Sequence, residues 1–236
     1  MNMDSKKPHW EGRSFVRRGR IHRERGLRCQ DAVFISRRND VIAASLADGS
    51  GSTDAAAAGA AVAARTAAEV LAGSFSFLYS KDMKEIRYYL ITEIRHALYN
   101  LCRERQLTLD QVHSTVVAVA LDEQTGRYIL AHIGDGMIVF FYGEDWEVVS
   151  APENGISRRY TRLTSMIPLG DAVRIRKGDL GSITRICLFS DGFREIDPEN
   201  GIGIFEEMME EGREITDTSD DISTVVLTKI RARSNI

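Results

Sequence analysis

The chain has 236 residues, of which 43% are hydrophobic, and this is enough for one large domain with a substantial core. Its formal net charge of −3 excludes the overall basic excess of a general nucleic-acid binder or of a protein held on anionic membranes. Three cysteines, at positions 29, 102 and 187, form neither a disulfide framework nor a zinc-site spacing.

The start of the chain is polar and lacks the apolar core of a signal peptide. We expect residues 1–10 to be a flexible tail and residues 11–236 to form a single domain. No apolar run reaches membrane-spanning length without a charge. With the cysteine usage, these features predict a soluble, cytoplasmic protein that binds neither nucleic acid nor membranes. The oligomeric state is left open.

Short apolar and β-branched runs predict three strands in the first part of the chain, at Ser14–Arg20, Ala32–Ser36 and Val41–Asp48. A polar connection, His22–Asp31, follows the first of them. A helix is predicted over Ala55–Ala72, where small residues allow close packing on a sheet. Residues 73–80 interrupt the helical pattern, and a second, amphipathic helix is predicted over Asp82–Arg105.

The second half of the chain has a hydrophobic period of two, which is typical of half-buried strands. It predicts strands at Ser114–Leu121, Arg127–Ile133, Met137–Tyr142, Trp146–Val149, Ala172–Lys177, Ile183–Ser190 and Ile222–Ile230. Between them, Ala151–Gly170 is long, polar and irregular and predicts a surface flap, and Ile204–Glu211 predicts a short helix. The whole pattern favours an α+β fold, a sandwich of two antiparallel β-sheets flanked by helices.

Arginine is concentrated near the start of the chain, at positions 13, 17, 18, 20, 23, 25, 28, 37 and 38. The C-terminal half is acidic by comparison. This asymmetry has two interpretations: an anionic ligand binds there, or the arginines form a solvated strand face.

Four aspartates lie at predicted strand ends or turns, and three of them are beside glycine: Asp48, Asp135, Asp191 and Asp220. Each by itself is most simply a turn residue that hydrogen-bonds its own backbone, and Asp48 could also cap the following helix. If loops at one edge of a sheet bring them together, their charges repel strongly unless cations lie between them. Oxygen ligands without a histidine or cysteine cluster favour Mg²⁺ or Mn²⁺.

Six short motifs, taken in chain order, resemble the motif series of the metal-dependent, type 2C serine/threonine protein phosphatases. They are Gln30-Asp31-Ala32, Leu46-Ala47-Asp48-Gly49, Ser114-Thr115-Val116-Val117, Ile133-Gly134-Asp135, Phe189-Ser190-Asp191-Gly192 and Asp220-Asp221-Ile222-Ser223. The resemblance runs from Gly19 to Leu227, and its start is most similar to the compact bacterial branch of the family.

The resemblance implies a binuclear centre of Mn²⁺ or Mg²⁺ ions. Asp48 would bridge the ions, the Gly49 carbonyl would bind one, Asp191 and Asp220 would bind the other, Asp31 would orient metal-bound waters, and Asp135 matches the position of a third, weaker ion. The implied function is hydrolysis of phosphoserine or phosphothreonine monoesters in proteins through a metal-bridged hydroxide, opposing a kinase. The alternative is a catalytically weak relative that binds phosphoprotein as a regulatory module.

Four departures from the family's pattern are seen, two of them at Ser50, where eukaryotic relatives often have a histidine, and at Gly136-Met137, where the family has a serine-arginine pair. The other two concern the phosphate and the second ion. Gly26 stands where relatives often carry a phosphate-binding arginine, and Gln30 stands where a glutamate is common. We expect His22, with Arg25 or Arg28 beside it, to take the place of the arginine. Under the alternative, His22 only pins its loop by bonding a backbone carbonyl.

Three further residues have reactive side chains without the setting that a catalytic role requires. His132 lies on an apolar strand and is expected to be a core histidine. Ser114 and Thr115 resemble nucleophiles only by residue type, and we expect both to be strand residues near the site.

Overall fold

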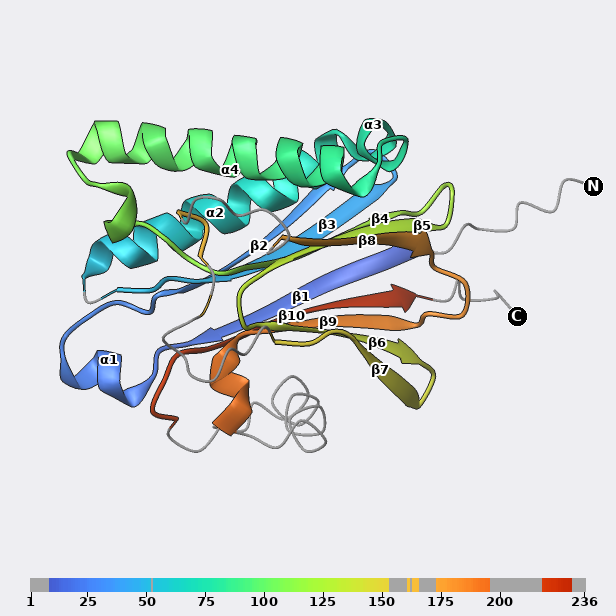
Figure 1. Cartoon of the computed structure of the whole chain (residues 1–236). Coiled ribbons are helices and arrows are strands. Elements are labelled where there is room, and N and C mark those ends of the chain that lie inside the picture. The colour runs from blue at the N-terminus through green and yellow to red at the C-terminus, as the bar shows by residue number, and fades with distance from the viewer. Residues whose placement is uncertain are drawn as a thin grey trace, which may run out of the picture.

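The computed structural model describes residues 9–51, 53–152, 161, 163–165, 173–195 and 218–230. These residues form two five-stranded sheets that pack face to face, with two long helices over the outer face of one sheet (Figure 1). All the strand pairs are antiparallel. The predicted α+β sandwich is therefore confirmed.

The sheet under the helices has the order β2-β3-β4-β5-β8. Its strands are β2 (Asp31–Arg38), β3 (Val41–Asp48), β4 (Val116–Asp122), β5 (Arg127–Ile133) and β8 (Arg174–Asp179). In the β2–β3 pair the first residue of one strand, Asp31, lies opposite the last residue of the other, Asp48. Two carboxylates therefore start side by side at one end of this sheet.

The second sheet has the order β1-β10-β9-β6-β7. Its strands are β1 (His9–Arg17), β10 (Ile222–Ile230), β9 (Arg185–Phe189), β6 (Met137–Tyr142) and β7 (Asp145–Ser150). Alternate residues of both sheets fill the space between them, where Leu46 and Val119 from one sheet share a buried cluster with Phe140 and Leu188 from the other.

Two long helices, α2 (Asp54–Gly73) and α4 (Met83–Arg105), cover the first sheet (Figure 1). The alanine face of α2 is fully buried, as at Ala60 and Ala64, so the helix lies close on the strands. By length and composition alone α2 could cross a membrane, but half of its apolar window is buried within the fold, as expected of a core helix. Asp82 and Glu85 form a capping box at the start of α4.

The remaining helical segments are short: α1 (Arg20–Glu24), α3 (Phe75–Tyr79) and the 3₁₀ turns η1 (Leu109–Gln111) and η4 (Asp191–Glu195). α3 lies within the predicted break at 73–80. A helical turn is stabilised there because it buries Phe75 and Leu78 in the core. α1 begins at Arg20, the predicted end of the first strand, and runs into the predicted polar connection; apolar periodicity gave no sign of it because none of its residues is buried.

The first strand differs most from its predicted bounds. β1 begins at His9 and ends at Arg17, whereas the prediction ran from Ser14 to Arg20. Its pairing with β10 runs from His9 to Arg17, and Trp10 is fully buried, so two residues assigned to the tail belong to the sheet. The predicted helix Ile204–Glu211 and most of the predicted flap lie outside the described residues.

Candidate metal centre

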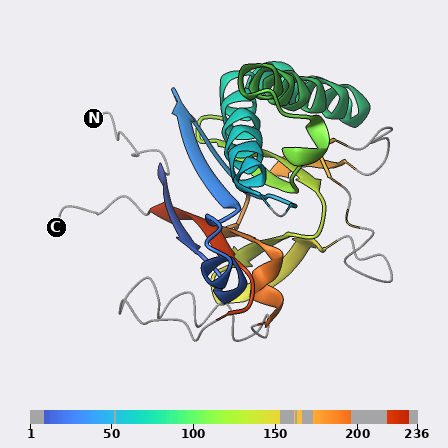
Figure 2. The same ribbon diagram turned by 90° about the vertical axis from the view of Figure 1, so that its left-hand side faces the viewer.

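Three aspartates from distant parts of the chain converge at one end of the sandwich. Carboxylate oxygens of Asp48, Asp135 and Asp191 all lie within 4.8 Å of one another. Asp48 ends β3, Asp135 lies in the turn between β5 and β6, and Asp191 follows β9. Figure 2 looks onto this end, where α1, η4 and the start of β10 lie beside one another.

The backbone after β3 is shaped by close packing against the start of α2. A β-carbon on Gly49 would lie 2.6 Å from the carbonyl oxygen of Ala56, so only glycine fits. The Gly49 amide donates to the Gln30 carbonyl at 3.0 Å. Thr115 holds Asp48 from the other side, because its amide donates to the Asp48 carbonyl at 2.9 Å and its Oγ1 accepts from the Asp48 amide at 3.1 Å. Thr115 therefore positions the site, and it lies near the site as expected, although it precedes β4 and is not itself a strand residue.

Asp31 is buried beside Asp48 and is held by hydroxyl groups. The Ser223 hydroxyl donates to its carboxylate at 2.6 Å, and the Ser190 side chain is a second hydrogen-bond partner. Burial, followed by the charges of Asp221 and Asp191, raises the pKa of Asp31 to about 7, even though the hydrogen bonds from the two serines lower it.

Asp48 experiences the strongest repulsion at this end of the molecule. Burial raises its pKa well above the ordinary value, and the next causes in order are the charges of Asp31, Asp191, Asp220 and Asp135. The structure thus brings together the five aspartates that the sequence singled out. A divalent cation would replace this repulsion by attraction, and carboxylates with a backbone carbonyl are the donor set that Mg²⁺ and Mn²⁺ prefer, so the residues fit the implied ions.

The backbone of the segment that carries Asp220 packs closely against two glycines, Gly19 and Gly192. A β-carbon on Gly19 would lie 2.2 Å from the Asp220 carbonyl carbon, and one on Gly192 would lie 2.0 Å from the Asp221 carbonyl oxygen. The Asp220 carboxylate accepts from the Asp221 amide at 2.9 Å. Side chains at either glycine would push this segment out of place, which explains why both positions need glycine.

Asp221 is a functional residue that the sequence reasoning passed over. It is 2% exposed, and its two oxygens accept from the Gly19 amide at 2.7 Å and from the Gln30 amide at 2.6 Å. The same carboxylate lies 2.9 Å from Nδ1 of His22. The available signal was a pair of aspartates directly before a strand, because when the first faces the site the second turns into the fold.

His22 is therefore next to a carboxylate. Nδ1 lies within ion-pair distance of the carboxylate but makes no hydrogen bond of good geometry with it, so neither the phosphate contact nor the carbonyl bond of the alternative is seen. Arg25 is the exposed residue that ends α1. The buried Gln30 amide group donates to the Thr53 carbonyl at 3.2 Å. A phosphate contact from His22 or Arg25 stays a prediction.

Two further expectations concern the surroundings of the site. Thr161, from the predicted flap, donates to the Asp135 carboxylate at 2.7 Å, so this part of the flap lies at the site. His132 is fully buried, as expected of a core histidine, and its Nδ1 lies 2.7 Å from the Ser150 hydroxyl. Burial, followed by the charge of Arg174, lowers the pKa of His132 to about 3.

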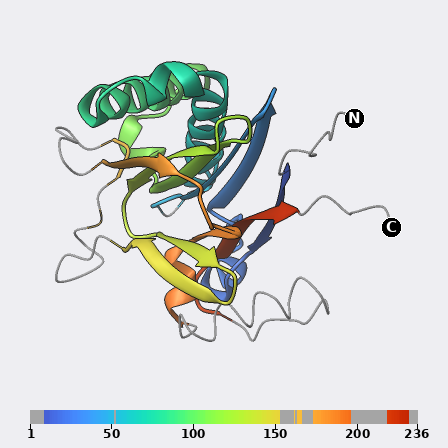
Figure 3. The same cartoon turned by 90° about the vertical axis from the view of Figure 1, so that its right-hand side faces the viewer.

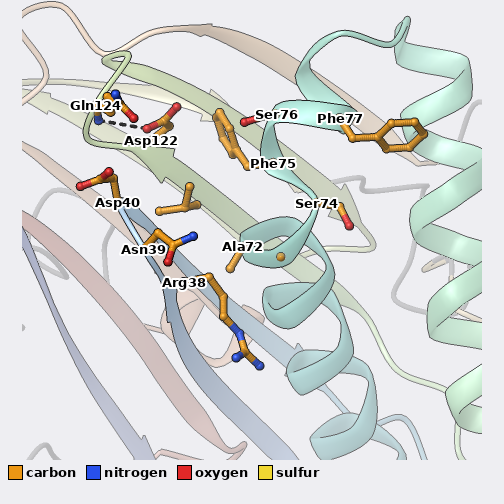
Figure 4. A pocket seen from close by; sticks show the side chains of 12 residues that line it. Arg38, Asn39, Asp40, Ala72, Ser74, Phe75, Ser76, Phe77, Asp122 and Gln124 are labelled. Atoms are coloured by element: carbon orange, nitrogen blue, oxygen red, sulfur yellow. Dashed lines mark hydrogen bonds between the residues drawn. The ribbon is translucent and has the colours of Figure 1, made fainter.

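A pocket of about 450 Å³ lies away from the aspartates, at the opposite end of β2. Figure 4 shows its lining, which includes Arg38, Asn39, Phe75, Asp122 and Gln124. Figure 3 views the molecule from this end, where the β2–β3, β4–β5 and β6–β7 turns lie. The pocket is thus separate from the carboxylate cluster.

The comparisons with known proteins agree with this arrangement. No curated protein matches the sequence. Among solved structures, PppA, described as a key regulatory component of T6SS in Pseudomonas aeruginosa, has a TM-score of 0.67 and 15% identity, over 95% of this chain and 99% of that one. The S. agalactiae serine/threonine phosphatase has a TM-score of 0.65 and 15% identity, over 93% and 99% of the two chains.

RsbX in complex with magnesium has a TM-score of 0.57 and 11% identity, over 94% of this chain and 96% of that one. At these identities the likeness concerns the fold. The family described as protein phosphatase 2C matches residues 18–226, which is most of the sequence. The converging aspartates, the paired sheets and this match together show that the chain belongs to the protein phosphatase 2C family.

Proposed function

We propose that this protein is a metal-dependent phosphatase that hydrolyses phosphoserine and phosphothreonine monoesters in proteins. The observation that carries the proposal is the convergence of Asp48, Asp135 and Asp191 within 4.8 Å. Carboxylates this close together repel one another and cost stability when no cation is bound. Such a cluster of perturbed groups is typical of a functional site.

Each residue of the centre has a defined task in this proposal. Asp48 would bridge two ions of Mn²⁺ or Mg²⁺, with the Gly49 carbonyl on one ion and Asp191 and Asp220 on the other. Asp135 would hold a third, weaker ion. When bound, the ions supply a nucleophile derived from water and neutralise charge on the phosphate. Asp31, fixed by the Ser223 hydroxyl, would accept hydrogen bonds from water in the site and so orient it.

The relatives support the substrate class. The S. agalactiae protein is a serine/threonine phosphatase, and RsbX was solved in complex with magnesium. We extend both properties to this chain, with a phosphorylated protein as substrate and a protein kinase as the opposing activity. A cytoplasmic location, expected from the cysteine usage and polar start, is part of the same proposal.

A second candidate, a catalytically weak module that binds phosphoproteins, is favoured by two contacts. The Gln30 amide group is engaged with the Thr53 carbonyl, and His22 lies against Asp221. Gln30 stands where the family's pattern has a glutamate, and His22 is the residue expected to replace the arginine that is missing at Gly26. A site with weaker ion binding and a weaker phosphate anchor would turn over slowly.

Turnover of p-nitrophenyl phosphate separates the two candidates. We expect hydrolysis with Mn²⁺, none with excess EDTA, and none from Asp48→Asn under either condition. Hydrolysis that survives both EDTA and Asp48→Asn would reject the metal-dependent reaction. Phosphopeptide binding without turnover would favour the module.

A further inference from the structure

Residues 17–28, which we call the arginine arm, carry a dense positive charge beside the acidic centre. They include six arginines and one glutamate. Arg28 is 81% exposed and Arg20 is 48% exposed at their side chains, and Arg25 is exposed as well. Arg20 pairs with Glu24 at 3.1 Å, and Arg28 pairs with the exposed Asp54 at 3.6 Å. Six arginines against these two acidic residues still leave the arm with excess positive charge.

The arm is fixed to the segment that carries Asp220. The buried carboxylate of Asp221 accepts hydrogen bonds from the amide of Gly19, near the start of the arm, and from the amide of Gln30, two residues after its end. The first turn of α1 adds two backbone bonds, from the Arg20 amide to the Thr218 carbonyl at 2.9 Å and from the Ile21 amide to the Ser219 carbonyl at 3.1 Å. The positive surface therefore keeps a set position relative to the centre.

Bonds inside the arm stiffen it further. The Arg18 guanidinium donates to the Leu27 carbonyl at 3.1 Å, and the Arg23 guanidinium donates to the Arg18 carbonyl at 2.5 Å. The Leu27 amide also donates to the His22 carbonyl at 2.9 Å. Two arginines thus serve the shape of the arm, whereas Arg20, Arg25 and Arg28 are exposed around it.

We propose that the arginine arm is a docking surface for acidic residues that flank the phosphorylated residue of the substrate. The inference rests on the proposed function and names its substrate class: phosphoprotein segments rich in aspartate or glutamate. With the phosphate at the aspartate end, neighbouring substrate residues would lie along the adjacent arm. Planar guanidinium groups bind carboxylates with two parallel hydrogen bonds.

An acidic peptide fits this surface better than a nucleic acid or an anionic membrane does. The arm borders buried carboxylates, and the chain as a whole has a net charge of −3. A long polyanion would extend past the arm over a chain of negative overall charge, whereas a short peptide spans only the arm and the centre.

The test compares three phosphothreonine peptides that differ only in their flanks, with glutamate, alanine or lysine at the two positions on either side. We expect kcat/KM with Mn²⁺ to be about 3- to 10-fold higher for the glutamate peptide than for the alanine peptide, since each exposed ion pair is worth about 0.2–1 kcal/mol. The lysine peptide should be the poorest substrate, and 0.5 M NaCl should reduce the differences.

Arg20→Gln should remove about 2- to 3-fold of the preference for the glutamate peptide without changing turnover of p-nitrophenyl phosphate. Arg38→Gln, an exposed arginine at the far end of β2, is the matched control and should change neither. Equal kcat/KM for the three peptides, or equal effects of the two substitutions, would overturn the inference while p-nitrophenyl phosphate turnover keeps the proposed function standing.

If p-nitrophenyl phosphate is not hydrolysed, the proposed function fails, and fluorescence anisotropy of the same peptides tests the docking surface separately. Tighter binding of the glutamate peptide that depends on Arg20 would still support the arm. Tighter binding of a single-stranded oligonucleotide or of phosphatidylserine vesicles, with the same dependence on Arg20, would assign the arm to a polyanion and reject the peptide.

Discussion

The two ends of the sandwich treat buried carboxylates in opposite ways. At the far end, Asp122 accepts from the Gln124 amide at 2.9 Å and from the Thr125 hydroxyl at 2.6 Å, and Glu123 pairs with Arg37 at 2.9 Å. At the metal end, Asp31 and Asp48 are buried among other carboxylates, and burial followed by the charges of these neighbours raises the pKa of both. Acidic groups matched by local donors maintain a turn, whereas acidic groups gathered together mark the place for an added cation.

The largest expected effect on activity comes from removing a carboxylate at the metal end, and a matched substitution at the far end serves as its comparison. Asp48→Asn should lower kcat/KM for p-nitrophenyl phosphate by more than about 100-fold, because losing an ion ligand costs more than the 10–100-fold typical of residues behind the ligands. Without metal, Asp48→Asn should melt at a higher temperature than wild type, because the repulsion between the carboxylates is relieved.

Asp122→Asn is the matched variant at the far end. It should lower the melting temperature and leave kcat/KM within about 3-fold of wild type, because it loses turn hydrogen bonds worth about 1 kcal/mol each. If Asp48→Asn destabilises the metal-free protein as Asp122→Asn does, the contrast between the two ends is wrong.

Mn²⁺ should stabilise the wild-type protein against unfolding, and it should do so only by binding at the metal end. At a concentration 100 times the dissociation constant, the gain in unfolding free energy is about 2.7 kcal/mol for one site. Differential scanning fluorimetry with Mn²⁺ and with EDTA measures it as a rise of about 5–11 °C in melting temperature. The rise should vanish in Asp48→Asn and persist in Asp122→Asn, and a full rise in both variants would place the ions elsewhere.

Ser223→Ala probes a residue that touches the site only through Asp31. The lost hydroxyl held the Asp31 carboxylate at 2.6 Å, so we expect kcat to fall by about 10-fold with little change in KM. Ser223→Thr keeps a hydroxyl on the strand and should recover part of the loss. Steady-state kinetics with p-nitrophenyl phosphate test this, and a fall in stability without a fall in kcat would make Ser223 purely structural.

The smallest effect is the pH dependence of stability in the metal-free protein. The folded pKa of Asp31 is raised to about 7 from 3.8, and that of Asp48 is raised too, so the folded state keeps protons that the unfolded chain releases near pH 4. Their contribution to stability is complete below pH 4 and is lost as pH rises toward 7.

Melting temperatures in EDTA should therefore fall with rising pH across this window, by about 3 °C or more, in wild type relative to Asp48→Asn. Saturating Mn²⁺ should remove the difference in slope, because an ion takes the place of the protons. Parallel pH profiles for the two metal-free proteins would show that the carboxylates do not repel as the structure indicates.

Much of the site could be predicted from the sequence, because its residues follow simple local rules. Asp48, Asp135 and Asp191 each follow a strand and adjoin a glycine, and strands of period two bring such ends to one edge of a sandwich. The helix α2 was equally predictable, since its apolar faces match the helical period and its alanines allow close approach to the sheet.

The rest could not be predicted because it depends on contacts between distant segments. The role of Asp221 is defined by amides at Gly19 and Gln30, about 200 residues earlier in the chain, and the position of His22 follows from that contact. α1 has no buried residue, so its helical turn is fixed by bonds to residues 218 and 219 and not by its own pattern. Local sequence carries no record of such partners.

The interior position of β10 in its sheet has a consequence for protein synthesis. β10 lies between β1 and β9. Asp220 and Asp221 directly precede this strand, and Ser223 lies within it. A growing chain on the ribosome lacks these residues until β10 emerges, so no earlier intermediate holds a complete centre. A chain that has not yet formed β10, or that has lost it to proteolysis, would therefore lack the proposed activity.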